Sequence, residues 1–407
     1  MLFCLAVSVL HTKLAGLAWL LLLVAAAFSA RGPLHGGHSD VTRASHHWTA
    51  GVAFFLAVVV ALAVIWPAGD SLASSDMNTG FRLLTAALAT LVLVKRTGPL
   101  QMPIEHANTA VAVALALGFL LVVAVDRALP SHPVPWAVSM AVWVAFLLPH
   151  SMDKETSKHR SLAYAGAVML GIFGVLLSQS RGAYAIVFWP LILLVANSRG
   201  LNHQALLRVG WLGALSMSLL AMSVLLPADP LRLRLAWNEV ETALETKDFN
   251  SSLGARVYLF QTGWDGFVES PWVGVGAAER TRRLQSAGLQ LPPAKTERFS
   301  HVRTLGHVHN QYLHQAMDGG LLGLSGLLAI LAGMIAAAWR LRRAHKIASQ
   351  QLAGIAFVHA TASLSNVNFA HNYYVLMLGL SISVVFLQAA TKTETDKSLT
   401  QTPLYRQ

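Results

Sequence analysis

Apolar runs of membrane length constrain this chain more than any other feature. A helix that crosses a bilayer needs ~20 apolar residues, with a range of about 17 to 25. A further short apolar stretch, Leu2–Leu10, precedes the first full run. The runs lie near 13–29, 48–66, 81–94, 107–125, 134–150, 160–177, 181–196, 205–226, 319–339, 349–365 and 371–390. This pattern predicts an all-α polytopic membrane protein with 11 or 12 spans.

The composition supports this class and excludes others. Of the 407 residues, 55% are hydrophobic and 12% charged, whereas a soluble domain carries about 25% charged residues. The single cysteine, Cys4, excludes a disulfide framework and a thiolate metal site. The net charge of +11 would suit nucleic acid, but the basic residues fall in short loops between apolar runs, where positive-inside topology explains them. We expect no nucleic-acid partner.

Lysine and arginine also predict the orientation. One set of alternate loops is rich in them, while the other short loops hold only Arg127 and Arg181. The first set is therefore expected to be cytoplasmic. The N-terminus then lies inside only if Leu2–Leu10 counts as a span, which favours 12. The basic set comprises Arg31, Arg43, Lys95, Arg96, Lys154, Lys158, Arg160, Arg199, Arg208, Arg340, Arg342, Arg343 and Lys346.

This topology divides the chain into four parts. Residues 1–226 form an N-terminal transmembrane bundle, 227–318 a long periplasmic loop, 319–390 the C-terminal transmembrane helices and 391–407 a cytoplasmic tail. The loop far exceeds the usual connection between helices. A polar interval of this length, ending at the edge of an apolar run, is where we expect the chemistry.

The long loop is expected to contain interfacial helices. Residues 230–247 and 255–268 are predicted to be helical, and 290–303 an irregular loop. The second helix has an apolar face rich in aromatic side chains, which suits a membrane surface. We therefore predict that it lies along the membrane and covers the site. The face comprises Val257, Phe260, Trp264 and Phe267.

The first candidate site segment is Ser178–Tyr184, between two apolar runs on the outer side. An arginine there is costly unless it reaches water or an anion. Arg181 is either an interfacial arginine whose charge extends to water or a phosphate ligand, since a guanidinium offers forked donors. Ser178 and Ser180 could add hydroxyl donors.

The second candidate is Arg256, near the start of the predicted helix 255–268. An arginine in the first turn of a helix, beside its free N–H groups, makes a good anion site. The alternative is a solvated loop charge.

The third candidate is the segment His307–Gly320, which leads directly into an apolar run. A neutral imidazole is the natural general base near pH 7, and His309, followed by Asn310, is the best candidate. The alternative is a surface histidine. A metal site of His301, His307, His309 and His314 would lack nearby paired carboxylates or thiolates, so we expect no metal.

All three segments are predicted to lie on one side of the membrane. Arginines that face a histidine suit transfer from a diphosphate, because the arginines hold the leaving group while the histidine takes a proton from the attacking hydroxyl. We expect Arg181 and Arg256 to converge on one water-accessible cavity beneath the loop.

Three motifs, in this order, resemble the O-antigen ligase and polymerase superfamily over residues 170–340. They are Ser180-Arg181-Gly182-Ala183-Tyr184; Arg256 upstream of Glu269-Ser270-Pro271-Trp272-Val273-Gly274-Val275-Gly276; and His309-Asn310-Gln311-Tyr312-Leu313 followed by Gly319-Gly320-Leu321-Leu322-Gly323.

The resemblance implies an integral-membrane (GT-C-like) glycosyltransferase that works at the periplasmic face of the bacterial inner membrane. Its donor would be a glycan on undecaprenyl diphosphate and its acceptor lipid A–core, with inversion and without metal, nucleotide or other cofactor. Arg181 and Arg256 would bind the diphosphate and His309 would be the base. Further candidates are Ser178, Ser180, Asn310, Tyr312, His307 and Arg303. We expect a monomer in contact with membrane lipids.

Other functions stay open at this stage. Polymerases of the superfamily use a second lipid-linked glycan as acceptor, and protein O-oligosaccharyltransferases use a Ser or Thr hydroxyl. The compact chain with one dominant late loop favours a ligase. A transporter is the alternative of another class, although no repeated halves are visible, and a structural scaffold would not need the late polar loop.

Overall fold

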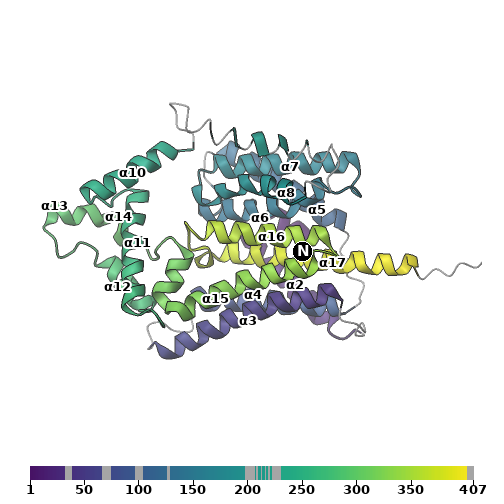
Figure 1. Cartoon of the computed structure of the whole chain (residues 1–407), viewed down its shortest axis with the longest axis horizontal. Helices are drawn as coiled ribbons and strands as arrows, with labels where there is room; N and C mark the ends of the chain where they lie inside the picture. Colours follow the sequence, from purple (N-terminus) through teal and green to yellow (C-terminus); the bar gives the residue numbers. More distant parts are fainter. Residues whose placement is uncertain are drawn as a thin grey trace, which may run out of the picture.

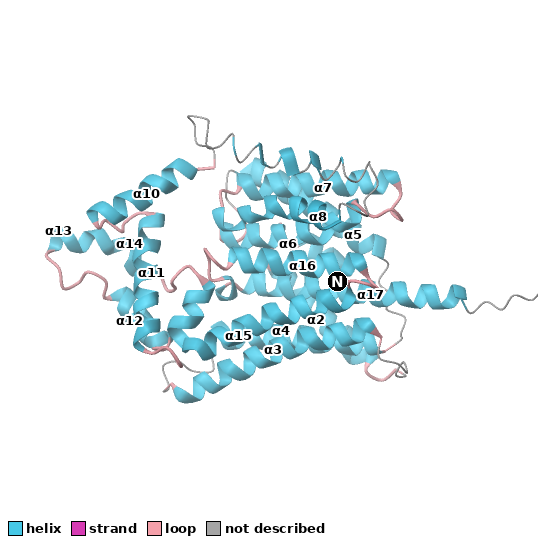
Figure 2. Ribbon diagram, viewed as in Figure 1, coloured by secondary structure: helices cyan, strands magenta, loops and turns pink. Residues whose placement is uncertain are grey.

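The computed structural model describes residues 1–32, 39–66, 75–96, 104–125, 129–197 and 231–400, with isolated residues between 207 and 221. Within these ranges the chain forms helices and loops without a strand (Figure 2). Among the described residues, seven helices are long and apolar enough to cross a membrane. They are α3 (Asp40–Ile65), α4 (Ser75–Lys95), α5 (Ile104–Val125), α6 (Pro133–Ser151), α7 (Lys158–Leu177), α15 (Gln311–Leu341) and α17 (Asn372–Thr400). The protein is therefore a polytopic membrane protein.

Shorter helices complete the bundle. They are α1 (Leu2–Val7), α2 (Lys13–Ser29), η2 (Arg181–Phe188), its continuation α8 (Trp189–Asn197), and α16 (Lys346–Ala362). The six residues of α1 extend only about 9 Å, which is too short to cross a bilayer. The expected count of 12 is therefore not confirmed, and the expected span 205–226 lies outside the fully described ranges.

The bundle is organised around α6, α15 and α3. Every residue of α6 from Pro135 to Ser151 is buried, as expected for a helix that is apolar on all sides. Helix α15 runs along α3 (Figure 1). A Cβ at Gly51 of α3 would overlap the carbonyl of Ala329, so small residues allow the two backbones to approach closely. At the far end of this pair, Arg340 bonds Asp40 at 2.7 Å.

The long loop folds into a small helical layer beyond one end of the bundle (Figure 1). It contains α10 (Leu233–Thr246), α11 (Ser252–Glu269), α12 (Ala277–Gln285), α13 (Pro293–Thr296), η3 (Glu297–Phe299) and α14 (Ser300–Arg303). The layer has an apolar core of its own, which includes Leu259, Leu284 and Phe299. Helix α11 runs across the direction of the bundle helices (Figure 1).

The expectation that 290–303 is irregular is wrong. This stretch forms short helices, because side chains satisfy the carbonyls of its tight turns. Arg303 Nη1 donates to the carbonyls of Ala287 at 3.1 Å and Thr296 at 2.9 Å. Apolar periodicity cannot reveal such local bonds.

The predicted helix at 255–268 is present as α11, but it is packed through a different face. Its buried residues are mostly small, including Ala255, Gly263 and Gly266, and a Cβ at Gly263 would lie 2.8 Å from Leu313 of α15. The predicted apolar face is only partly covered by protein: Val257 packs against the core of the loop layer, whereas Trp264 is 58% exposed. Its contact with a membrane stays a prediction.

Candidate functional site

The His309 segment is fixed by the start of α15. Asn310 is the N-cap: its Oδ1 accepts from the Leu313 N–H at 3.0 Å, and its Nδ2 donates to the Leu364 carbonyl at 3.0 Å. This bonding gives Asn310 a structural role. His309 itself has φ of +55°, a left-handed conformation that costs a non-glycine residue about 1–3 kcal/mol and is concentrated at functional sites.

The Arg181 segment is a tight turn between α7 and η2. Ser178 Oγ donates to the Val175 carbonyl at 2.7 Å and accepts from the Ser180 N–H at 3.3 Å. Gln179 has φ of +55°, so this segment also holds a left-handed residue. Arg181 Nη1 donates to the Arg232 carbonyl at 3.3 Å. Both serines therefore lie in the turn that presents Arg181.

The connection between α16 and α17 joins these two segments. The Gln311 N–H donates to the Ser363 carbonyl at 2.8 Å, and Gln311 Oε1 accepts from the Phe369 N–H at 3.0 Å. The same connection also packs against the Arg181 segment, because an added Cβ at Gly182 would overlap Ser365 Oγ. Tyr312, a further candidate, is held nearby, because its hydroxyl donates to the Ala360 carbonyl at 3.0 Å.

Arg256 lies within electrostatic range of both Arg181 and His309. Burial and, to a smaller extent, the Arg181 charge lower the pKa of Arg256 to about 10. Burial also lowers the pKa of His309 to about 2, with contributions from His307 and Arg256. Arg256 thus links the Arg181 segment to the His309 segment, because its guanidinium is influenced by Arg181 and itself influences His309.

Four histidines gather at this site. The ring centroids of His307 and His309 lie 4.3 Å apart, those of His307 and His371 6.3 Å, and those of His132 and His371 6.0 Å. Burial lowers the pKa of both His307 and His371 to about 4, and neighbouring histidines add to the shift. His132 and His371 are not among the site residues predicted from the sequence. The signal that could have identified them is their place in the chain, because His132 directly precedes α6 and His371 directly precedes α17.

Other sequence candidates lie elsewhere. Arg303 bonds the loop's own carbonyls, as described above. His314 is buried in α15, with Nε2 3.6 Å from Asp318 Oδ2. In the part of the chain that the structure describes, no group of three or more His, Cys, Asp or Glu is arranged to hold a metal ion.

A buried ion pair supports the histidine segment. Arg280 Nε donates to both carboxylate oxygens of Asp318, at 2.8 and 3.0 Å, and Arg280 Nη1 donates to the Gly306 carbonyl. Arg280 thus links α12 to α15 and to the residue before His307. Arg280 could not be predicted as a site residue, because nothing in the local sequence distinguishes it from the neighbouring Arg282 and Arg283.

The segment 271–276 is a backbone clasp on α15. The N–H groups of Val275 and Gly276 donate to the carbonyls of Met317 and Asp318, at 2.8 and 3.2 Å. In return, the Leu321 N–H donates to the Pro271 carbonyl at 2.7 Å. Such close contact requires glycine on both sides, and Gly274 and Gly320 both have positive φ. We name these paired segments the clasp.

The fold and the site together define a polytopic membrane protein with a cationic, histidine-containing site at one end of its bundle. The family model described as O-Antigen ligase matches residues 166–328, a segment that carries Arg181, Arg256 and His309. This match confirms the resemblance to the O-antigen ligase and polymerase superfamily, whose members are glycosyltransferase-like enzymes that act on lipid-linked glycans.

A curated protein also resembles the chain. An uncharacterized protein of Haemophilus influenzae (strain ATCC 51907 / DSM 11121 / KW20 / Rd) is 25% identical over 200 residues, which cover 48% of this chain and 47% of that protein. The chain therefore spans about half the length of this relative.

Proposed function

We propose that the protein is an O-antigen ligase, which transfers a glycan from undecaprenyl diphosphate to lipid A–core at the periplasmic face of the inner membrane. The observation that carries this proposal is the gathering of Arg181, Arg256 and His309 within the segment matched by the ligase family. A diphosphate needs forked cationic donors, and an attacking hydroxyl needs a base.

The proposed reaction assigns one role to each group. Arg181 and Arg256 bind the diphosphate and stabilise the charge that develops as it leaves. His309 accepts the proton of the acceptor hydroxyl while the hydroxyl oxygen bonds to the anomeric carbon. The bond from that carbon to the diphosphate oxygen breaks, and the diphosphate keeps the electron pair. Attack from the opposite side inverts the anomeric configuration. No metal or other cofactor takes part.

The electrostatics support this assignment. A base must be neutral before it accepts a proton, and the pKa of His309, lowered by burial and neighbouring positive charge, keeps the imidazole neutral near pH 7. Arg256, even with its pKa lowered to about 10, stays charged at that pH. At the same pH, His309 is therefore neutral, as a base must be, and Arg256 is charged, as a diphosphate ligand must be.

The loop layer is suited to a membrane surface. Trp264 of α11 and Trp272 after it are 58% and 73% exposed, and indole rings favour the membrane–water interface. We propose that this side of α11 rests on the outer leaflet, so that a lipid-linked donor enters sideways from the bilayer.

The test is transfer by the purified protein with an undecaprenyl-diphosphate glycan and one of three acceptors: lipid A–core, a second lipid-linked glycan, or a peptide. Transfer to lipid A–core, undiminished by a chelator and lost in Arg256→Ala, is the expected result. Extension of the lipid-linked glycan would identify a polymerase, and a modified peptide a protein O-oligosaccharyltransferase. Movement of the donor across vesicles without transfer would identify a transporter.

A further inference from the structure

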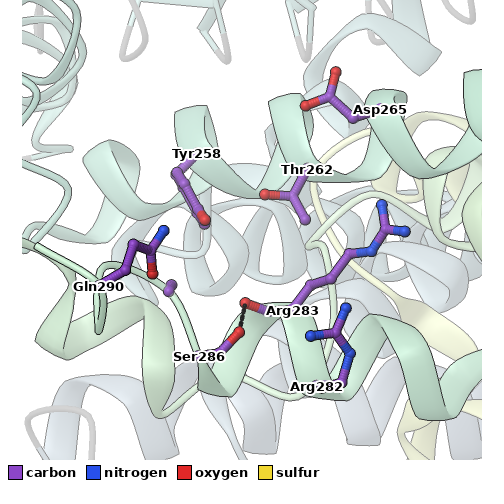
Figure 3. A pocket seen from close by; sticks show the side chains of 8 residues that line it. Tyr258, Thr262, Asp265, Arg282, Arg283, Ser286 and Gln290 are labelled. Atoms are coloured by element: carbon purple, nitrogen blue, oxygen red, sulfur yellow. Dashed lines mark hydrogen bonds between the residues drawn. The ribbon is translucent and has the colours of Figure 1, made fainter.

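A polar pocket of about 250 Å³ lies between α11 and α12, outside the arginine and histidine site. Tyr258 and Thr262 of α11 lie across from Arg283 of α12 and from Ser286, which directly follows that helix. Gln290 lies at one end of the pocket (Figure 3). Asp265 completes the α11 side of the pocket.

The pocket and Arg256 lie on different faces of the same helix. At about 100° per residue, Tyr258 and Asp265 project roughly opposite to Arg256 on α11. Thr262 lies about 9 Å further along the helix axis than Arg256. The pocket is thus separated from the proposed diphosphate site by little more than the thickness of α11.

Several polar groups of the pocket have no hydrogen-bond partner in the part of the chain that the structure describes. Among the described residues, the side chains of Tyr258, Thr262 and Gln290 make no hydrogen bond to another residue. A hydroxyl both donates and accepts, and an amide offers one oxygen and an NH₂ group. The pocket therefore presents free donors and acceptors in a mixture.

The cations of the pocket are already neutralised. Arg283 bonds Glu279 at 2.7 Å and Glu269 at 2.6 Å, and Arg282 bonds Glu279 at 2.6 Å. The carboxylates of Glu279 and Glu269 would repel a phosphate, so a second phosphate site does not fit here. An uncharged ligand with many hydroxyl groups does fit.

We propose that this pocket is a carbohydrate subsite, which binds one sugar of the glycan some distance from the reacting bond. The inference rests on the proposed function. The sugar belongs either to the donor glycan or to the core acceptor, because both carry the same hydroxyl chemistry. Binding there would hold the substrate equally before and during the reaction, so it would lower KM without changing kcat.

The test uses direct binding by the full-length protein in detergent. The triple variant Tyr258→Phe, Thr262→Val and Gln290→Ala removes the three free polar groups with little change in packing. The matched control is Gln261→Ala, at an exposed position of α11 that does not line the pocket. The probes are the O-glycan and the core oligosaccharide, each released by mild acid from the bacterium's lipopolysaccharide and titrated by saturation-transfer NMR.

We expect the triple variant to bind one of the two probes at least tenfold more weakly than the wild type, while Gln261→Ala binds like the wild type. Loss of O-glycan binding assigns the pocket to the donor, and loss of core binding assigns it to the acceptor. Unchanged binding of both probes, or no binding of either probe by the wild type, overturns the proposal.

Two further measurements separate this proposal from the proposed function. Binding of sugar-free undecaprenyl diphosphate should be unchanged in the triple variant, and in transfer assays its KM should rise while kcat stays near the wild-type value. If the wild type transfers to none of the three acceptors, the proposed function fails, but a selective loss of glycan binding in the triple variant still supports the pocket.

Discussion

Arg280 and Asp318 form a buried, two-point ion pair between the loop layer and α15, with Arg280 Nε 2.8 and 3.0 Å from the two carboxylate oxygens. Arg280 is only 8% exposed. The same guanidinium holds the Gly306 carbonyl, so the pair also anchors the residues that lead to His307 and His309. The site thus depends on a contact that joins two distant parts of the chain.

Removing one partner of this pair should destabilise the protein strongly. Arg280→Met leaves the Asp318 carboxylate buried and unpaired, which typically costs about 3–5 kcal/mol. The double variant Arg280→Met with Asp318→Leu should recover much of the loss, because neither charge is then stranded. The measurement is the melting temperature of the purified protein in detergent.

The exposed pair of Arg282 with Glu279 provides the control for this prediction. Arg282 is 68% exposed at its side chain, and exposed ion pairs contribute little to stability because solvent screens them. Arg282→Ala should barely change the melting temperature. If Arg280→Met and Arg282→Ala lowered the melting temperature equally, the buried pair would contribute no more to stability than the exposed pair.

The clasp should not tolerate a side chain at Gly274. Its φ is +72°, and an added Cβ would overlap the backbone of Asp318. Gly274→Ala should therefore separate the loop layer from α15 and reduce both the melting temperature and transfer. Gly306→Ala is the matched control, since nothing lies within 4 Å of its added Cβ. A Gly274→Ala protein with wild-type melting temperature would contradict the close approach.

Loss of either site arginine should impair the reaction more than it impairs folding. Arg181→Ala and Arg256→Ala should each lower kcat about 10²–10³-fold, by analogy with the loss of one donor to a developing anion. Arg→Lys should also be impaired, because the forked geometry is lost. Rates are measured at saturating donor, with Lys295→Ala, an exposed charge of the loop layer, as control. Full activity in both lysine variants would argue against forked recognition.

His309→Ala should fold and bind donor but transfer about 10²–10⁴-fold more slowly, as expected for loss of a general base. His301→Ala, in the same loop, should transfer like the wild type. The measurement is the rate at equal donor occupancy, with a chelator present in a parallel reaction. Near-equal rates of His309→Ala and wild type would remove His309 from the reaction as its base.

The pH profile gives a separate test of His309. A base is active when unprotonated, so it loses activity as the pH falls through its pKa. Because that pKa is lowered to about 2, kcat/KM, which reports the free enzyme, should not decrease on account of His309 between pH 8 and pH 5. A base with an ordinary pKa of about 6.5 would lose half its activity near that pH. A protonation step near pH 6.5 assigned to His309 by NMR would contradict the burial described here.

The class of protein and three of the site segments could be predicted from sequence because both depend on local composition. Apolar runs of membrane length force helices, since the backbone must satisfy its own hydrogen bonds in lipid. Counting basic residues in alternate loops also predicted that Arg181, Arg256 and His309 share one side of the membrane, and that placement stays a prediction. The short helix α1 escaped this reasoning, because apolar character alone does not state how far a helix continues.

The remainder was decided by tertiary structure. Composition showed an aromatic face on α11, but packing selected the opposite, small-residue face, because close approach to α15 requires glycine at Gly263 and Gly266. His132, His371 and Arg280 join the site through contacts between segments far apart in the chain. A sequence pattern reports the period and polarity of one segment at a time, whereas which distant segments meet depends on how all the helices pack together.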